Sequence, residues 1–133
     1  AVVQKYDNVP PMLTRYASNL ECSWHGLAET PEGRSQVKLV LLLIGANDMA
    51  MLKAHEGKAA ERIQERFISG YASLLSVIRE HRPGVPIVSL LGDAASMSAC
   101  HLGEQNWYRN CLSKFIHEAH SRFGNDELCF VHA

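Results

Sequence analysis

The pattern of apolar positions predicts three strands. Residues 39–44 are six consecutive apolar residues ended by Gly45, a run too short for a helix and apolar on both faces. Such a run is typical of a strand buried between two layers in a parallel sheet. Two further apolar segments, 85–91 and 127–131, each follow a turn that contains glycine, and we expect both to be strands.

The segments between these strands have the spacing of amphipathic helices. Residues 59–81 carry an apolar stripe at steps of three and four, made of Ile63, Phe67, Tyr71, Leu74, Leu75 and Ile78. A similar stripe runs from Trp107 to Phe123 and ends at Gly124, a natural C-terminal cap. The charged face of the first helix (Glu61, Arg62, Glu65, Arg66, Arg79 and Glu80) predicts a solvated surface. A short helix is expected at 11–20.

Strands that alternate with long helices are joined by right-handed crossovers. The sequence therefore predicts a three-layer α/β/α domain with a parallel sheet. The 133 residues, 47% of them hydrophobic, supply one core and a single domain, 1–133. Ligands of such sheets gather at the carboxyl ends of the strands, which here are followed by Gly45–Asp48, Gly92-Asp93 and His132.

Charge and apolar run length exclude several kinds of partner. The 13 basic and 14 acidic residues leave no net field to hold a polyanion, which argues against nucleic acid and anionic membrane surfaces. The longest apolar run is far short of the ~18 to 20 residues that cross a bilayer. We expect no nucleic-acid partner and no membrane association. Neither a secreted nor a cytoplasmic location is favoured.

Four cysteines (Cys22, Cys100, Cys111 and Cys129) occur without CxxC spacing. A metal site needs ligands clustered tightly enough to surround the ion, so we expect reduced cysteines packed as small hydrophobic residues. The alternative, in an oxidising compartment, is a disulfide between Cys100 and Cys111. No metal site is predicted.

The tetrapeptide Gly45-Ala46-Asn47-Asp48 is the most informative element for chemistry. Glycine allows a sharp turn and close approach of a ligand, and the amide of Asn47 is a neutral donor that can hold an oxyanion. The alternative is an ordinary turn in which Asn47 and Asp48 bond only to nearby backbone.

Together with the preceding strand, this tetrapeptide closely resembles the GxND block of the SGNH hydrolases, also called GDSL-type esterases. The helix and link that follow in that family are also matched, by Phe67, Tyr71, Leu74, Leu75, Arg79, Pro83 and Ile87. Residues 2–15 weakly resemble a segment of carbohydrate deacetylases of the acetyl-xylan-esterase kind. The resemblance implies a flavodoxin-like fold and a serine esterase that removes acyl groups, most plausibly O-acetyl groups of a carbohydrate, without metal or organic cofactor.

The resemblance also assigns roles. Asn47 would donate to the oxyanion, Gly45 would shape the turn, and Asp48 would brace it. The family's Gly-Asp-Ser nucleophile block is absent, and no Asp-x-x-His block follows the third strand. Either the chain is an internal segment of a longer hydrolase, which we favour, or it is a degenerate domain. We expect this chain alone to lack esterase activity and its first strand to have an unpaired edge that invites self-association.

Other candidate residues are weaker. His55, in the expected loop after the oxyanion turn, would border the substrate, and His132 lies near where the family's base enters, although Cys129 stands where its Asp partner would be. Ser96, in Gly92-Asp93-Ala94-Ala95-Ser96, is displaced from a tight turn by two residues and is not expected to be a nucleophile.

Three other histidines, His101, His117 and His120, are not expected to take part in chemistry. His117 and His120 lack a third ligand nearby and are expected on the helix surface. His101 and Cys100 are adjacent along the chain, which rarely gives the geometry of a nucleophile and base.

A second function also fits the chain: a non-catalytic carbohydrate-binding or interaction domain derived from the same fold. Exposure of Trp24, Trp107 or Tyr108 along the cleft would favour it.

Overall fold

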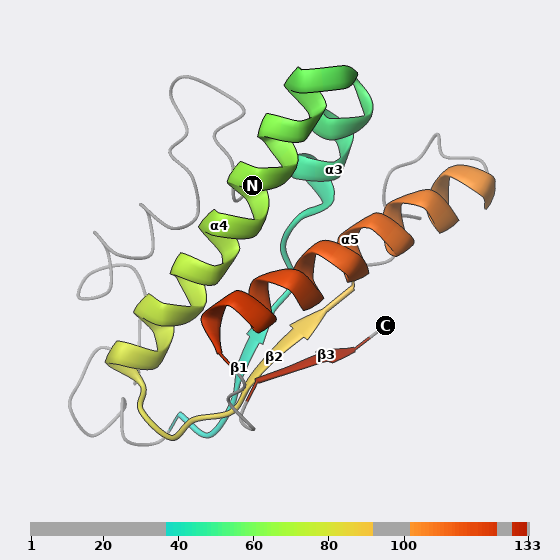
Figure 1. Cartoon of the computed structure of the whole chain (residues 1–133). Helices are drawn as coiled ribbons and strands as arrows, with labels where there is room; N and C mark the ends of the chain where they lie inside the picture. Colours follow the sequence, from blue (N-terminus) through green and yellow to red (C-terminus); the bar gives the residue numbers. More distant parts are fainter. Residues whose placement is uncertain (1–36, 92–101, 125–128, 133) are drawn as a thin grey trace.

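The computed structural model describes residues 37–91, 102–124 and 129–132. Their elements follow one another as β1 (Val40–Leu42), α3 (Ala46–Lys53), α4 (Gly57–His81), β2 (Ile87–Leu90), α5 (Leu102–Phe123) and β3 (Cys129–His132) (Figure 1). The predicted strand–helix–strand–helix–strand order is confirmed. The helix expected at 11–20 lies outside the described residues.

The three strands form one parallel sheet in the order β1-β2-β3. Val40 lies opposite Ile87, and Ser89 lies opposite Val131, so each strand pairs with the next one along the chain. Because parallel strands share one direction, their carboxyl ends lie at the same edge of the sheet. The chain that follows β1 and the last residue of β3 are therefore brought to this edge.

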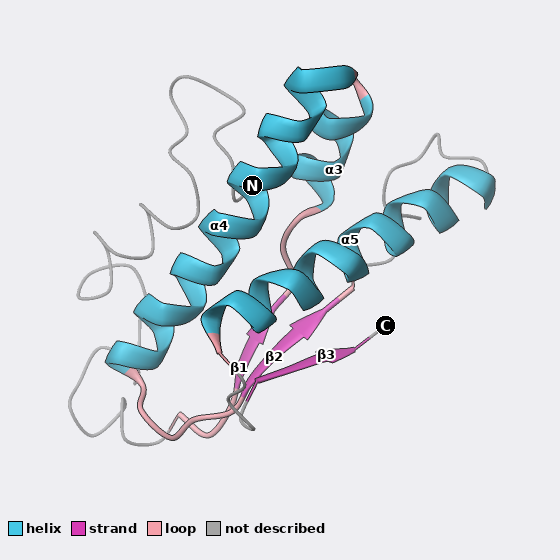
Figure 2. Ribbon diagram, viewed as in Figure 1, coloured by secondary structure: helices cyan, strands magenta, loops and turns pink. Residues whose placement is uncertain are grey.

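Both long helices cover the same face of the sheet (Figure 2). Two right-handed crossovers that step in the same direction place their helices on one side. On β1, Val40 and Leu42 pack against the core, whereas the alternate residues Leu39, Leu41 and Leu43 are 48%, 56% and 62% exposed. The expectation that this strand is buried on both faces is therefore wrong for the part of the chain that the structure describes.

The core lies between the sheet and the two long helices. Its fully buried side chains include Phe67, Tyr71 and Ile116, with Ile87 contributed by β2. The Phe67 ring centroid lies 5.7 Å from that of Tyr71 and 6.2 Å from that of Phe115, so aromatic contacts join α4 to α5. The stripe predicted for α4 is the face that the helix buries.

A short helix, α3, stands where a loop was expected. It begins at Ala46, directly after Gly45, and buries Asp48, Met49 and Leu52. Most of its residues are good helix formers, but eight residues are too few to show a clear apolar period. The segment after β1 is therefore helical, and Asn47 lies in the first turn of α3.

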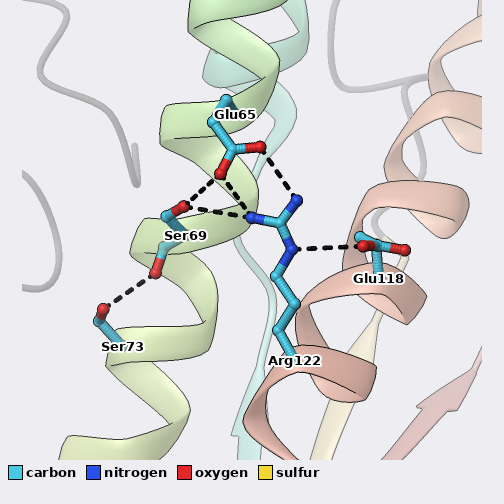
Figure 3. A network of polar contacts seen from close by, with 5 residues as sticks. All are labelled: Glu65, Ser69, Ser73, Glu118 and Arg122. Carbon is cyan, nitrogen blue, oxygen red and sulfur yellow. Dashed lines mark hydrogen bonds and ion pairs between the residues drawn. The ribbon is translucent and has the colours of Figure 1, made fainter.

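The charged face of α4 is not only a solvated surface. Arg122 of α5 binds both carboxylate oxygens of Glu65, with Nη1–Oε1 and Nη2–Oε2 distances of 2.5 and 3.0 Å (Figure 3). Glu118 and Ser69 complete this network. Arg79 donates to the carbonyl of Val85 at 2.6 Å and ties the end of α4 to the link into β2. Glu65 and Arg79 thus hold elements together, contrary to the expectation from sequence.

The Glu65–Arg122 pair predicts a pH-dependent contribution to stability. The hydrogen bond from Arg122 is the main reason that the pKa of Glu65 falls to about 2. A lowered carboxyl pKa stabilises the fold above the unfolded pKa of about 4.5, and this contribution disappears as pH falls toward 2. We expect Glu65→Gln to lower the urea midpoint slightly at pH 7 and to make no difference near pH 2. Glu61→Gln, one turn away on α4, is the control, and an equal effect of both variants at pH 7 would contradict the assignment.

Candidate active site

The turn after β1 is built around Gly45. Its φ of 121° lies in the region that only glycine adopts easily, and its carbonyl accepts the first hydrogen bond of α3, from the Met49 amide at 2.9 Å. A Cβ atom at this position would overlap Cδ1 of Leu112 and lie 3.3 Å from the Phe67 ring. Backbone conformation and packing therefore both require glycine here, which fits the turn-shaping role expected from the sequence.

Asn47 is exposed in the first turn of α3, at the carboxyl edge of the sheet. Within the described segments, no hydrogen bond occupies its carboxamide and α3 has no side-chain cap. The ordinary-turn alternative would require the Asn47 side chain to bond to nearby backbone, and no such bond is present in the described segments. A free amide beside the unpaired N–H groups of a helix start is able to donate to an anionic oxygen.

Asp48 is completely buried, as is Met49 after it, whereas Asn47 before it is exposed. A carboxylate in the first turn of a helix is stabilised by the positive end of the helix dipole. Its burial keeps it away from any ligand at the surface. The position suits the bracing role predicted for Asp48 rather than direct contact with a substrate.

The two candidate histidines lie in different settings. His55 is exposed just beyond α3, and its Nδ1 lies 2.8 Å from the carbonyl oxygen of Met51, so the ring helps to end that helix. His132 is the last residue of β3 and is in register with Leu90. The topology thus brings the backbone of His132 to the same sheet edge as Gly45.

The aromatic residues do not form an exposed platform in the described part of the chain. Tyr108 is buried, with Lys53 Nζ 5.8 Å from its ring centroid, and the half-buried Trp107 meets it edge-on at 5.2 Å. The exposure of Tyr108 that would favour a carbohydrate-binding domain is therefore not observed. Trp24, together with Ser96, Cys100 and His101, lies outside the described residues.

Among the side chains that the structure describes, there is neither a cluster of possible metal ligands nor an activated thiol. No group of three potential ligands among them has the geometry to bind an ion. Cys111 is a free, half-buried cysteine, and burial raises the pKa of its thiol, which disfavours the reactive thiolate. None of the described helices is long and apolar enough to span a membrane.

The sequence interpretation missed a buried polar network that joins three elements. Tyr71 of α4 donates to the Ser89 hydroxyl at 2.7 Å, and Ser89 Oγ of β2 lies 2.8 Å from Nε2 of His120 on α5. The sequence predicted that His120 lies on the helix surface. This prediction is wrong, because the ring is partly buried and bonded to Ser89. Two signals were present in the sequence: a lone serine in an apolar strand, and a histidine four residues after the buried Ile116.

This serine–histidine pair does not have the properties of a catalytic dyad. Ser89 has no exposed surface, so an ester cannot reach its hydroxyl. Burial, with a smaller effect of His117, lowers the pKa of His120 to about 4, which makes the imidazole a weak base at neutral pH. Burial likewise raises the pKa of Tyr71 to about 12. The network is a structural link within the core.

Comparisons with protein-family models, with curated proteins and with solved structures find no match to this chain.

Proposed function

We propose that this chain forms part of an SGNH-type serine esterase and supplies the asparagine of its oxyanion hole. The observation that carries the proposal is the turn after β1. A glycine that its surroundings require is followed by an exposed asparagine whose amide is free among the described residues, at the carboxyl edge of a parallel sheet. The expected substrate is an O-acetyl ester of a carbohydrate or another small ester.

In the proposed reaction, a serine from another segment of the enzyme attacks the ester carbonyl and transfers its proton to a histidine base. The carbonyl oxygen becomes an oxyanion, and the Asn47 Nδ2–H group donates a hydrogen bond to it. Collapse of the tetrahedral intermediate expels the alcohol, which takes the proton from the histidine, and water later releases the acyl group by the reverse sequence. Its place in the first turn of α3 would orient Asn47 before the charge develops.

The exposed face of the sheet, opposite α4 and α5, supports the proposed three-layer fold. Leu39, Leu41 and Leu43 present an apolar stripe on the side opposite α4 and α5. A second helical layer on that side would bury the stripe and complete the three-layer, flavodoxin-like architecture. Self-association through β1, which lies at the edge of the described sheet, is the competing way to cover it.

Activity measurements test the proposal. The 133-residue chain should hydrolyse p-nitrophenyl acetate no faster than buffer. A longer product of the same gene that includes a Gly-Asp-Ser block and an Asp-x-x-His block should be active and phosphonate-sensitive. In that protein, Asn47→Ala should lower kcat by about 10²- to 10³-fold, because one oxyanion donor is lost.

Gln64→Ala removes an amide from α4 instead and should leave kcat unchanged. A phosphonate-sensitive rate in the 133-residue chain would overturn the expectation that its nucleophile lies elsewhere. Equal effects of Asn47→Ala and Gln64→Ala in the longer protein would exclude Asn47 from the oxyanion hole.

A further inference from the structure

We propose that His120 is a proton-sensitive latch: in its neutral form it holds α5 against α4 and β2, and acid releases α5 together with the Gly45 turn that α5 supports. This device is independent of the esterase proposal. It follows from the hydrogen-bond geometry of Tyr71, Ser89 and His120 and from the position of Leu112 against Gly45.

The proposal assigns one protonation state to the neutral ring. The Tyr71 hydroxyl donates to Ser89, and in the proposed resting state the serine proton goes to an unprotonated Nε2 of His120. The remaining ring proton is on Nδ1, a buried atom that has no hydrogen-bond partner among the described residues. The neutral imidazole therefore completes a directed chain of bonds from α4 through β2 to α5.

Protonation would break this chain. Nε2 would become a donor, so Ser89 would have to accept two bonds and turn its own proton away from both partners. The imidazolium would also place a positive charge in a buried setting, beside an Nδ1–H group that already lacks a partner among the described residues. Movement of α5 toward solvent relieves both penalties, because the ring can then be hydrated.

The charges around His120 do not offset this cost. Tyr71 on α4 is uncharged, with its ring centroid 6.3 Å from that of His120, and Ser89 on β2 does not titrate. His117 on α5 opposes a second positive charge. Glu65 and Glu118 are already bound to Arg122. The titratable residues of β3 are Cys129 and His132, in register with Ile87 and Leu90.

Movement of α5 would also change the packing of the candidate site, because Leu112 of α5 lies against Gly45. Leu112 lies two turns before His120 on α5 and contacts the position where a Gly45 side chain would be. When α5 moves, Leu112 no longer supports the turn that presents Asn47. Acid should therefore loosen residues 107–123 and the turn around Gly45 together.

Hydrogen exchange followed by mass spectrometry tests the latch in the 133-residue chain. After correction for intrinsic rates, we expect exchange in 107–123 and 43–53 to be roughly 10- to 30-fold faster at pH 5 than at pH 7. His120→Gln keeps an amide near Ser89 but cannot titrate, and it should remove this pH dependence. His117→Gln, on the exposed side of the same helix, should retain it.

A direct titration of the wild-type protein keeps the test independent of how the variants fold. NMR of the imidazole nitrogens should show His120 neutral with its proton on Nδ1 at pH 7, and titrating well below 6.5. A ring that titrates near 6.5 would overturn the proposal. The same would follow if His120→Gln and the wild type lost protection of α5 equally between pH 7 and 5.

Discussion

Gly45→Ala is expected to lower the free energy of unfolding by about 2 to 6 kcal/mol. Two effects add. The φ of 121° costs any residue with a Cβ atom about 1 to 3 kcal/mol, and the new methyl group would overlap Leu112 and crowd Phe67 at 3.3 Å, which overpacks the core by a similar amount. Urea unfolding at pH 7 measures the sum.

The chain contains a matched control for this variant. Gly124 has the same φ of 121°, and an added Cβ would meet no described atom within 4 Å. Gly124→Ala therefore reports the backbone strain alone and should cost less than Gly45→Ala. The double variant Gly45→Ala with Leu112→Ala should lose clearly less free energy of unfolding than the two single variants lose together. The reason is that the shortened side chain at position 112 removes the overlap. Equal losses at the two glycines would show that packing around Gly45 contributes nothing.

Ser89→Ala is expected to cost about 2 to 4 kcal/mol, more than the loss of one ordinary hydrogen bond. Ser89 is fully buried between two partners, so its removal leaves both the Tyr71 hydroxyl and Nε2 of His120 without their hydrogen bond. Tyr71→Phe should cost only about 1 kcal/mol, because Ser89 keeps its bond to His120. Urea unfolding at pH 7 gives each value.

A double-mutant cycle tests whether the network acts as a unit. With Tyr71 already replaced by Phe, Ser89→Ala leaves one unsatisfied group rather than two. Its cost in free energy of unfolding should therefore be smaller by about 1 kcal/mol or more. Ser73→Ala is the surface control: its hydroxyl donates to the Ser69 carbonyl on the exposed face of α4, and its loss should change stability by less than about 0.5 kcal/mol. Additive effects of Tyr71→Phe and Ser89→Ala would contradict the network.

The long elements could be predicted because their apolar period is set by what they bury. The stripe through Phe67, Tyr71 and Ile78 identified α4, and the same reasoning identified α5. The short helix α3 could not be found in this way, because its two buried apolar residues, Met49 and Leu52, are too few to define a period. The second helical layer remains a prediction, since the described helices lie on one face of the sheet.

The candidate site was predicted only in part, for a physical reason. Gly45 and Asn47 are only two positions apart in sequence, so a short motif was enough to single them out. The contact between Gly45 and Leu112, the ion pair of Glu65 with Arg122, and the bond between Ser89 and His120 join residues far apart along the chain. Periodicity reports which face of a helix is buried, but it does not report the partner across the core.

The packing of Gly45 against Leu112 also separates two evolutionary constraints that a motif search treats as one. Asn47 is exposed, so its replacement would cost the fold little, whatever its role in the proposed reaction. Gly45 would be retained in either case, because its backbone angle and its neighbours do not depend on catalysis. Among relatives of this chain, drift at position 47 with glycine kept at 45 would count against the proposed oxyanion role, whereas retention of both residues is what that role predicts.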